Sequence, residues 1–154
     1  MKARMVAVTL VLCFAGAVVC LATEWNMGSW KLNEDKSTFS AGAAKSTMVV
    51  YEAAGDSVKV TIDGTSGDGT PTHTEWTGKF DGKDYPATGD PNSGMRSYVK
   101  VNAHTLKFKL KSGDKVTLSG TIVTATDGKS RTVTASGTSP DGKKVSYTAA
   151  YDKQ

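Results

Sequence analysis

Stretches of alternating apolar and polar residues, separated by Asp-Gly pairs, restrict the possible fold more than any other feature of this sequence. Five such pairs occur, at residues 63–64, 68–69, 81–82, 127–128 and 141–142. Asp-Gly favours tight hairpin turns because such turns need a positive φ, which Gly adopts freely and Asp tolerates. The pattern therefore predicts an antiparallel sheet in which each strand pairs with the next one along the chain.

The alternation is clearest at Val58, Val60 and Ile62, and at Leu106, Phe108 and Leu110 between lysines. A period of two residues is typical of a strand with one buried face. Only residues 33–44 leave room for a single helical turn, because Gly and Thr are too frequent elsewhere for long helices. Ten strands are predicted, at about residues 28–33, 46–54, 57–64, 72–80, 83–88, 95–101, 104–110, 115–125, 130–138 and 143–151.

Ten consecutive strands with one apolar face each can bury that face by closing into a barrel, which also removes exposed sheet edges. A two-sheet sandwich is the alternative, but short hairpin connections favour the simple meander. The predicted fold is all-β: an up-and-down antiparallel β-barrel of about ten strands, formed by residues 23–154 as a single domain.

The first 22 residues differ in kind from the rest. Lys2 and Arg4 precede an uncharged apolar run, and small residues end it at Cys20-Leu21-Ala22. This layout predicts a signal peptide, residues 1–22, cleaved before Thr23. A retained membrane anchor and a lipid attached at Cys20 are the alternatives. We expect a secreted or periplasmic protein with no stable membrane insertion after leader removal.

Composition narrows the possible partners of the remaining 132 residues. Both cysteines, Cys13 and Cys20, lie in the leader, so a hydrophobic core without disulfides must hold the domain together. Removing Lys2 and Arg4 lowers the net charge from +4 to +2. The basic residues are spread along the strands, which argues against nucleic acid as a partner.

The segment Gly28-Ser29-Trp30-Lys31-Leu32, a Gly-x-Trp in the first strand of a predicted barrel, resembles the calycin superfamily of lipocalins and fatty-acid-binding proteins. The whole domain is similar to small secreted bacterial lipocalin-like proteins, a likeness carried also by Tyr51–Asp56, Phe80–Pro86 and Tyr151–Gln154. The resemblance implies that Trp30 closes one end of the barrel under a basic residue from a late strand. Arg131 is in phase with the inward Val133 and is one candidate; Lys153 is the other.

Two departures from the fatty-acid-binding proteins bear on ligand chemistry. About a dozen residues join the first two strands, too few for the helical lid of those proteins. Ala149 stands two residues before Tyr151, where the resemblance would place an arginine that holds a ligand carboxylate. A buried carboxylate would then lack a partner unless Arg131 points inward, and an unpaired buried charge is very costly.

Large and small residues share the expected inner face, which leaves two interpretations. The small residues Gly78, Gly120, Ala135 and Gly137 could leave a cavity for a small hydrophobic ligand. Alternatively, they relieve crowding while neighbouring aromatic rings fill the space. For the first interpretation the expected ligand-binding residues are Trp76, Phe80, Tyr85 at the barrel mouth, Phe108, Arg131 and Tyr147.

The remaining polar residues form no recognisable catalytic, metal-binding or cofactor-binding motif. His73 and His104 are isolated, so we expect neither a metal nor a cofactor. Arg96 alternates with Tyr98 opposite Val99 and Val101, which predicts an outward arginine. The chain has no Gly-x-Ser-x-Gly nucleophile motif and no phosphate-binding loop. We therefore expect a non-enzymatic binder of a small apolar or amphipathic molecule; the alternative is a cell-envelope structural or protein-interaction module with a filled barrel.

Overall fold

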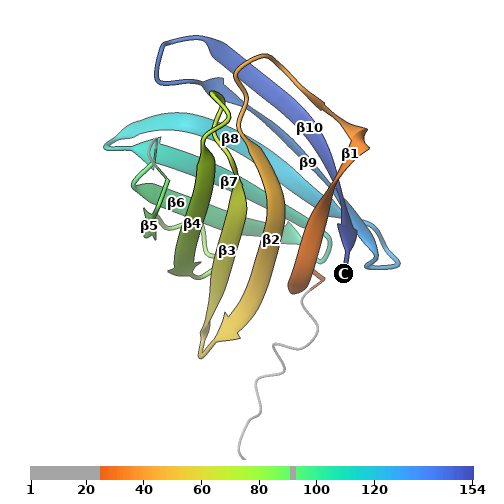
Figure 1. Ribbon diagram of the computed structural model, residues 1–154. Helices are drawn as coiled ribbons and strands as arrows, with labels where there is room; N and C mark the ends of the chain where they lie inside the picture. The colour runs from red at the N-terminus through yellow and green to blue at the C-terminus, as the bar shows by residue number, and fades with distance from the viewer. Residues whose placement is uncertain (1–24, 91–92) are drawn as a thin grey trace, which may run out of the picture.

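Ten antiparallel strands form a closed barrel in the computed structural model, which describes residues 25–90 and 93–154 (Figure 1). The predicted signal peptide lies outside the described residues. The strands are β1 (Gly28–Phe39), β2 (Lys45–Ala54), β3 (Ser57–Thr65), β4 (Pro71–Gly78), β5 (Tyr85–Thr88), β6 (Met95–Asn102), β7 (Thr105–Ser112), β8 (Lys115–Thr124), β9 (Ser130–Thr138) and β10 (Lys144–Lys153). The predicted all-β barrel is confirmed. None of the described residues forms a helix long and apolar enough to cross a membrane.

Each strand pairs with its neighbours in the chain, and β1 pairs with β10 to close the barrel. The partners there include Leu32 with Tyr151 and Phe39 with Tyr147, with a register shift between Asn33 and Thr38. The Ser37 hydroxyl holds this irregular stretch, because it donates to the carbonyl oxygen of Asn33 and accepts from the amide of Ala150. β1 therefore bends, and its second half follows β10 after leaving β2.

The two ends of the barrel differ in the connections that they carry. The start of β1 and the C-terminus lie side by side at one end, where the Gln154 amide donates to the Ser29 carbonyl (Figure 1). We call this the closed end. The other end, called the open end, carries the connections after β1, β3, β5, β7 and β9.

Two local expectations are wrong. β1 continues to Phe39, so residues 33–39 form strand where a helical turn was allowed. Asp63 and Gly64 lie within β3, where Gly64 lets the strand approach β2: a Cβ there would stand 2.0 Å from the Lys45 carbonyl oxygen. The turn after β3 instead uses Gly69, which has a positive φ and belongs to the next Asp-Gly pair along the chain.

The inward-facing glycines lie where neighbouring backbone or side chains approach closely. A Cβ on Gly120 would lie 2.4 Å from the Thr134 carbonyl oxygen, and one on Gly137 would lie 2.1 Å from that of Thr117. At Gly78 the space is taken by Trp76 and Tyr85, each 2.6 Å from the added atom. These glycines relieve crowding, as glycine does at tight bends in barrels. They do not leave room for a ligand.

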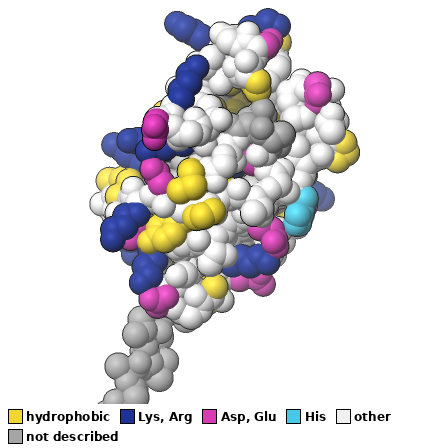
Figure 2. Space-filling view, turned by 90° about the vertical axis from the view of Figure 1, so that its left-hand side faces the viewer, with side chains coloured by type: hydrophobic (Ala, Val, Ile, Leu, Met, Phe, Trp, Pro, Cys, Tyr) yellow, Lys and Arg dark blue, Asp and Glu magenta, His cyan; other side chains and the backbone are white. Residues whose placement is uncertain are grey.

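Charged residues of both signs alternate on the face over β4, β5 and β6, around a small group of hydrophobic side chains (Figure 2). Cross-strand ion pairs join Lys59 to Glu75 and Lys79 to Asp56. All four side chains are at least 40% exposed, so each pair contributes little to stability.

Candidate functional site

Trp30 is fully buried at the closed end of the barrel. Its indole N–H donates to the carbonyl oxygen of Asn26 over 2.9 Å. The side-chain oxygen of Asn26 in turn accepts from the Thr124 hydroxyl, and both residues are buried. These hydrogen bonds hold the segment before β1 against the closed end of the barrel. They also satisfy its buried polar atoms, which are seldom left without a partner in folded proteins.

The guanidinium of Arg131 lies among three aromatic rings above this plug. Its central carbon is 4.6 Å from the Trp30 ring centroid, 4.9 Å from Tyr51 and 5.0 Å from Tyr151. Lys153 also approaches Trp30, with its ammonium nitrogen 5.3 Å from the ring. Both basic candidates therefore reach the tryptophan, but Arg131 is the buried one, at 3% exposure.

Arg131 carries its charge into the core with few polar partners. Its Nε and Nη1 atoms make no hydrogen bond within the described part of the chain. The ring faces offset this cost, since a desolvated cation over an aromatic ring gains about 2 kcal/mol. Burial raises the pKa of Tyr151 to about 12, against the opposing effect of Arg131, so this phenol is neutral at ordinary pH.

The aromatic residues predicted to line a ligand site pack against one another. Trp76 lies 4.8 Å from Tyr98 and 6.4 Å from Phe80, measured between ring centroids. Tyr85 meets Trp76 edge-on, and Phe108 lies 6.1 Å from Tyr98. This cluster occupies the closed half of the interior on the β2 to β7 side. Contact of these residues with a ligand stays a prediction.

The interior becomes accessible toward the open end. Phe39, Leu110, Leu118 and Tyr147 face inward, pack on the core and are each only partly buried. Phe39 and Tyr147 stack across the β1–β10 closure, with ring centroids 5.5 Å apart. An apolar inner surface is therefore exposed at this end of the barrel. Of the predicted ligand-binding residues, Tyr147 is the one that belongs to it.

Arg96 points inward, so its predicted outward orientation is wrong. It pairs with Leu110 across the β6–β7 ladder and is 6% exposed, whereas Val99 and Val101 are 40% and 52% exposed. The rule that apolar residues face inward misassigned this strand. Tyr98, a large aromatic in phase with Arg96, was the signal that could have identified the inner face.

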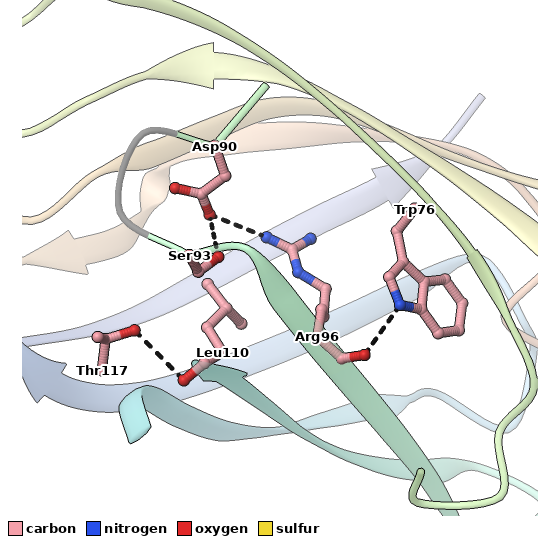
Figure 3. A network of polar contacts seen from close by, with 6 residues as sticks. All are labelled: Trp76, Asp90, Ser93, Arg96, Leu110 and Thr117. Carbon is pink, nitrogen blue, oxygen red and sulfur yellow. Dashed lines mark hydrogen bonds and ion pairs between the residues drawn. The ribbon is translucent and has the colours of Figure 1, made fainter. Parts of the chain in front are cut away.

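The Arg96 guanidinium has one ion-pair partner near the open end. Its Nη2 lies 3.5 Å from a carboxylate oxygen of Asp90, which also accepts a hydrogen bond from Ser93 (Figure 3). The backbone carbonyl of Arg96 accepts from the Trp76 indole. Its Nε has no hydrogen-bond partner among the described residues. The Arg96–Asp90 pair is long, and it leaves donor capacity on a buried cation.

Arg96 stays ionised although it is buried. Burial lowers the pKa of Arg96, but the neighbouring Tyr98 and the Asp90 carboxylate raise it, and the net shift is upward. Arg96 also acts on Tyr147, whose pKa is raised mainly by burial and lowered in part by this cation. The buried cation of β6 thus acts electrostatically on a buried phenol of β10.

A hollow of about 530 Å³ lies between the connection after β1 and the turn after β3. Phe39, Ser40 and Lys45 are among its lining residues. It results from the bend in β1, because β1 pairs with β2 only over Gly28 to Lys31 and then departs from it. The departure opens the barrel wall beside Phe39.

The two histidines lie apart from these interior sites. His73 is exposed, and its Nδ1 contacts a carboxylate oxygen of Asp63. The His104 ring lies 4.3 Å from that of Trp25 at the closed end. Within residues 25–90 and 93–154 no three His, Cys, Asp or Glu side chains gather as metal ligands would.

The comparison with known proteins finds a similarity of fold and nothing more specific. No protein-family model matches the sequence, and no curated protein matches it either. Among solved structures, the chain is similar to the redesigned β-barrel mFAP1 bound to DFHBI, with 16% identity, a TM-score of 0.44, and coverage of 86% of this chain and 98% of that one. It is also similar to EF1p2_mFAP2b bound to DFHBI, with 15% identity, a TM-score of 0.47, and coverage of 86% and 97%.

Replacing Trp30 with Ala should destabilise the protein by about 3 to 5 kcal/mol, because the change removes a fully buried ring and its contact with Arg131. Urea unfolding followed by circular dichroism measures this. The matched control is Trp25→Ala, at a tryptophan that is 36% exposed and should cost about 1 kcal/mol or less. A loss below about 1 kcal/mol for Trp30→Ala would contradict its role as the barrel plug.

Alkaline pH should destabilise the fold through Tyr151. Its folded pKa of about 12 exceeds the ordinary value of 10.0, so the unfolded chain binds fewer protons between these values. The contribution of Tyr151 to the free energy of unfolding is therefore fully present below pH 10 and is lost as the pH rises toward 12. Tyr151→Phe should flatten this decline by on the order of 1 to 3 kcal/mol, measured by urea unfolding from pH 8 to pH 12. Equal slopes for the two proteins would refute the assignment.

Proposed function

We propose that the protein is a calycin-like barrel that binds a small amphipathic anion in its open half. The observation that carries the proposal is Arg96: a buried, inward cation with an unused Nε donor beside a partly exposed apolar surface. The apolar part of such a ligand would contact Leu110, Leu118 and Tyr147. Its acidic group would accept a hydrogen bond from the free Nε–H group of Arg96.

Interior charge favours an anion over a neutral ligand. Among the described residues, the charged side chains in the buried class are Arg96 and Arg131, both cationic. Asp90 is the acidic partner, with 14% of its side chain exposed. Two buried cations and one partly buried carboxylate leave the interior positive. Because opposite charges interact strongly in a poorly solvated interior, an acidic ligand would be selected.

The rings in the closed half support the second candidate, an interaction module with a filled barrel. Trp76, Phe80 and Tyr98 already occupy space that a deeply buried ligand would need. The two functions differ in the open half: the first needs saturable binding near Arg96, and the second needs none.

Dodecanoate and dodecanol, matched in chain length, test the anion proposal by isothermal titration. The native protein should bind dodecanoate more tightly, and Arg96→Gln should weaken this binding by about 10- to 100-fold, the range for loss of a charged hydrogen bond. Dodecanol binding should change little in the variant. Trp76 fluorescence gives a second readout, since this indole contacts the Arg96 carbonyl.

Lys31→Gln is the matched control, because it removes one exposed positive charge from the outer face of β1. It should leave dodecanoate binding unchanged. Equal binding of the acid and the alcohol, with no effect of Arg96→Gln, would reject the anion site. Absence of saturable binding for both would favour the filled-barrel module. Urea unfolding of each variant verifies that the fold persists.

The leader supports a further proposal, that the protein is exported to a secreted or periplasmic location. The basic residues Lys2 and Arg4, the apolar run and the small residue Ala22 carry it. Mass spectrometry of the exported protein should find Thr23 at the N-terminus. Recovery of the intact chain in the cytoplasm would contradict the proposal.

A further inference from the structure

A groove of about 710 Å³ crosses β7, β8, β9, β10 and the end of β1. Its lining includes the outward residues Lys107, Thr121 and Thr134. The next inward residues along β8, Leu118 and Ile122, do not line it. The groove is therefore on the outer face of the barrel wall. Tyr147 and Phe108 contribute to its floor, but Arg96, Leu110 and Leu118 of the interior site do not line it.

Threonines form one row along this groove. Thr121 pairs with Thr134, Thr134 with Thr148, and Thr148 with Thr38, so the four stand on four adjacent strands. Neighbouring strands are about 4.8 Å apart, which makes the row about 14 Å long. A ligand that contacts the whole row must be extended.

Serines form a second, parallel row two residues away along each strand. Ser119 pairs with Ser136, and Ser136 pairs with Ser146. Residues two apart on a strand are separated by about 7 Å. None of these three hydroxyls, nor those of Thr134 and Thr148, donates or accepts a hydrogen bond within the described residues. Each can both donate to and accept from a ligand.

Two lysines stand at the β7 end of these rows. Lys107 pairs with Thr121 and Lys109 with Ser119, and both side chains are exposed. Neither has an ion-pair partner in the described ranges, in contrast to Lys59 and Lys79 on the opposite wall. Lys109 contributes to lowering the pKa of Asp84, but that carboxylate is paired with Lys111.

Acidic residues are missing from β7, β8 and β9 and from the groove lining. β7, β8 and β9 contain no Asp or Glu, and β10 contains only Asp152 near its far end. The strands β1 to β4, in contrast, carry Glu and Asp among their outward residues. The groove thus combines unpaired cations with free hydroxyls on a wall without opposing carboxylates.

We propose that this outer groove binds an anionic oligosaccharide, with sugar hydroxyls on the threonine and serine rows and an acidic group on Lys107 and Lys109. The rows match the dense hydroxyl groups of a sugar chain. A peptide would need an apolar or aromatic anchor, and Phe108 and Tyr147 beneath the groove point inward. A nucleic acid carries a charge on every nucleotide and would need more than two cations.

Tetragalacturonate, compared with the neutral maltotetraose, tests this proposal by isothermal titration in low salt. The native protein should bind the uronate oligomer more tightly, and added salt should weaken this binding. Lys107→Gln combined with Lys109→Gln should weaken uronate binding at least tenfold. Thr134→Val combined with Thr148→Val should weaken both sugars about tenfold, since two hydrogen bonds contribute roughly this much.

The matched control is Lys59→Gln combined with Lys79→Gln, which removes the same charge from the opposite wall. It should leave uronate binding unchanged. An equal loss in the control would reveal unspecific charge attraction and overturn the proposal. Equally tight binding of tetra-aspartate would also overturn it, in favour of an acidic peptide. Arg96→Gln should not affect the sugar, so failure here is distinguishable from failure of the interior site.

Discussion

Pairing between β1 and β10 is the constraint on which the rest of the structure depends. Without it the sheet would keep two open edges, and the inner faces of ten strands would share no enclosed space. The pairing is interrupted at Asn33 to Thr38, where Ser37 bridges the two strands. This bend lets one strand serve both ends of the barrel: its first residues carry Trp30 into the closed end, and its last place Phe39 beside Tyr147.

The two buried arginines divide the interior into parts with different chemistry. Arg131 is enclosed by Trp30, Tyr51 and Tyr151, whose ring faces stabilise the charge. Arg96 contacts a single carboxylate at 3.5 Å and retains a free donor. Similar cations therefore have unlike roles. Both arginines keep donors without a hydrogen bond, but Arg131 lies among three rings at the closed end, whereas Arg96 lies beside the partly exposed apolar surface of the open half, where a ligand can complete its hydrogen bonding.

Alternation and turn residues were sufficient to predict the barrel and nearly all strand positions, because a one-residue slip would expose an entire apolar face. The Gly-x-Trp resemblance pointed to Trp30 at the closed end with Arg131 or Lys153 as its cation, and both basic side chains approach that ring. The logic of alternation failed on β6, where Val99 and Val101 face solvent and Arg96 faces inward. The interior there needs Tyr98 to fill space beside Trp76, and this packing requirement depends on strands far apart in the sequence. Asp63-Gly64 shows a related limit: a residue pair typical of turns serves close strand approach instead.

The hydrogen bond between Gln154 and Ser29 places the C-terminus and the start of the barrel at the closed end, opposite the mouth (Figure 1). This gives the molecule a polarity along its axis. A segment joined to either end of the barrel domain would attach at the closed end, away from the open end. A tether or a fused domain would therefore be attached to the closed end of the barrel. The short distance between the two ends also suits circular permutation, with a new opening at one of the exposed turns.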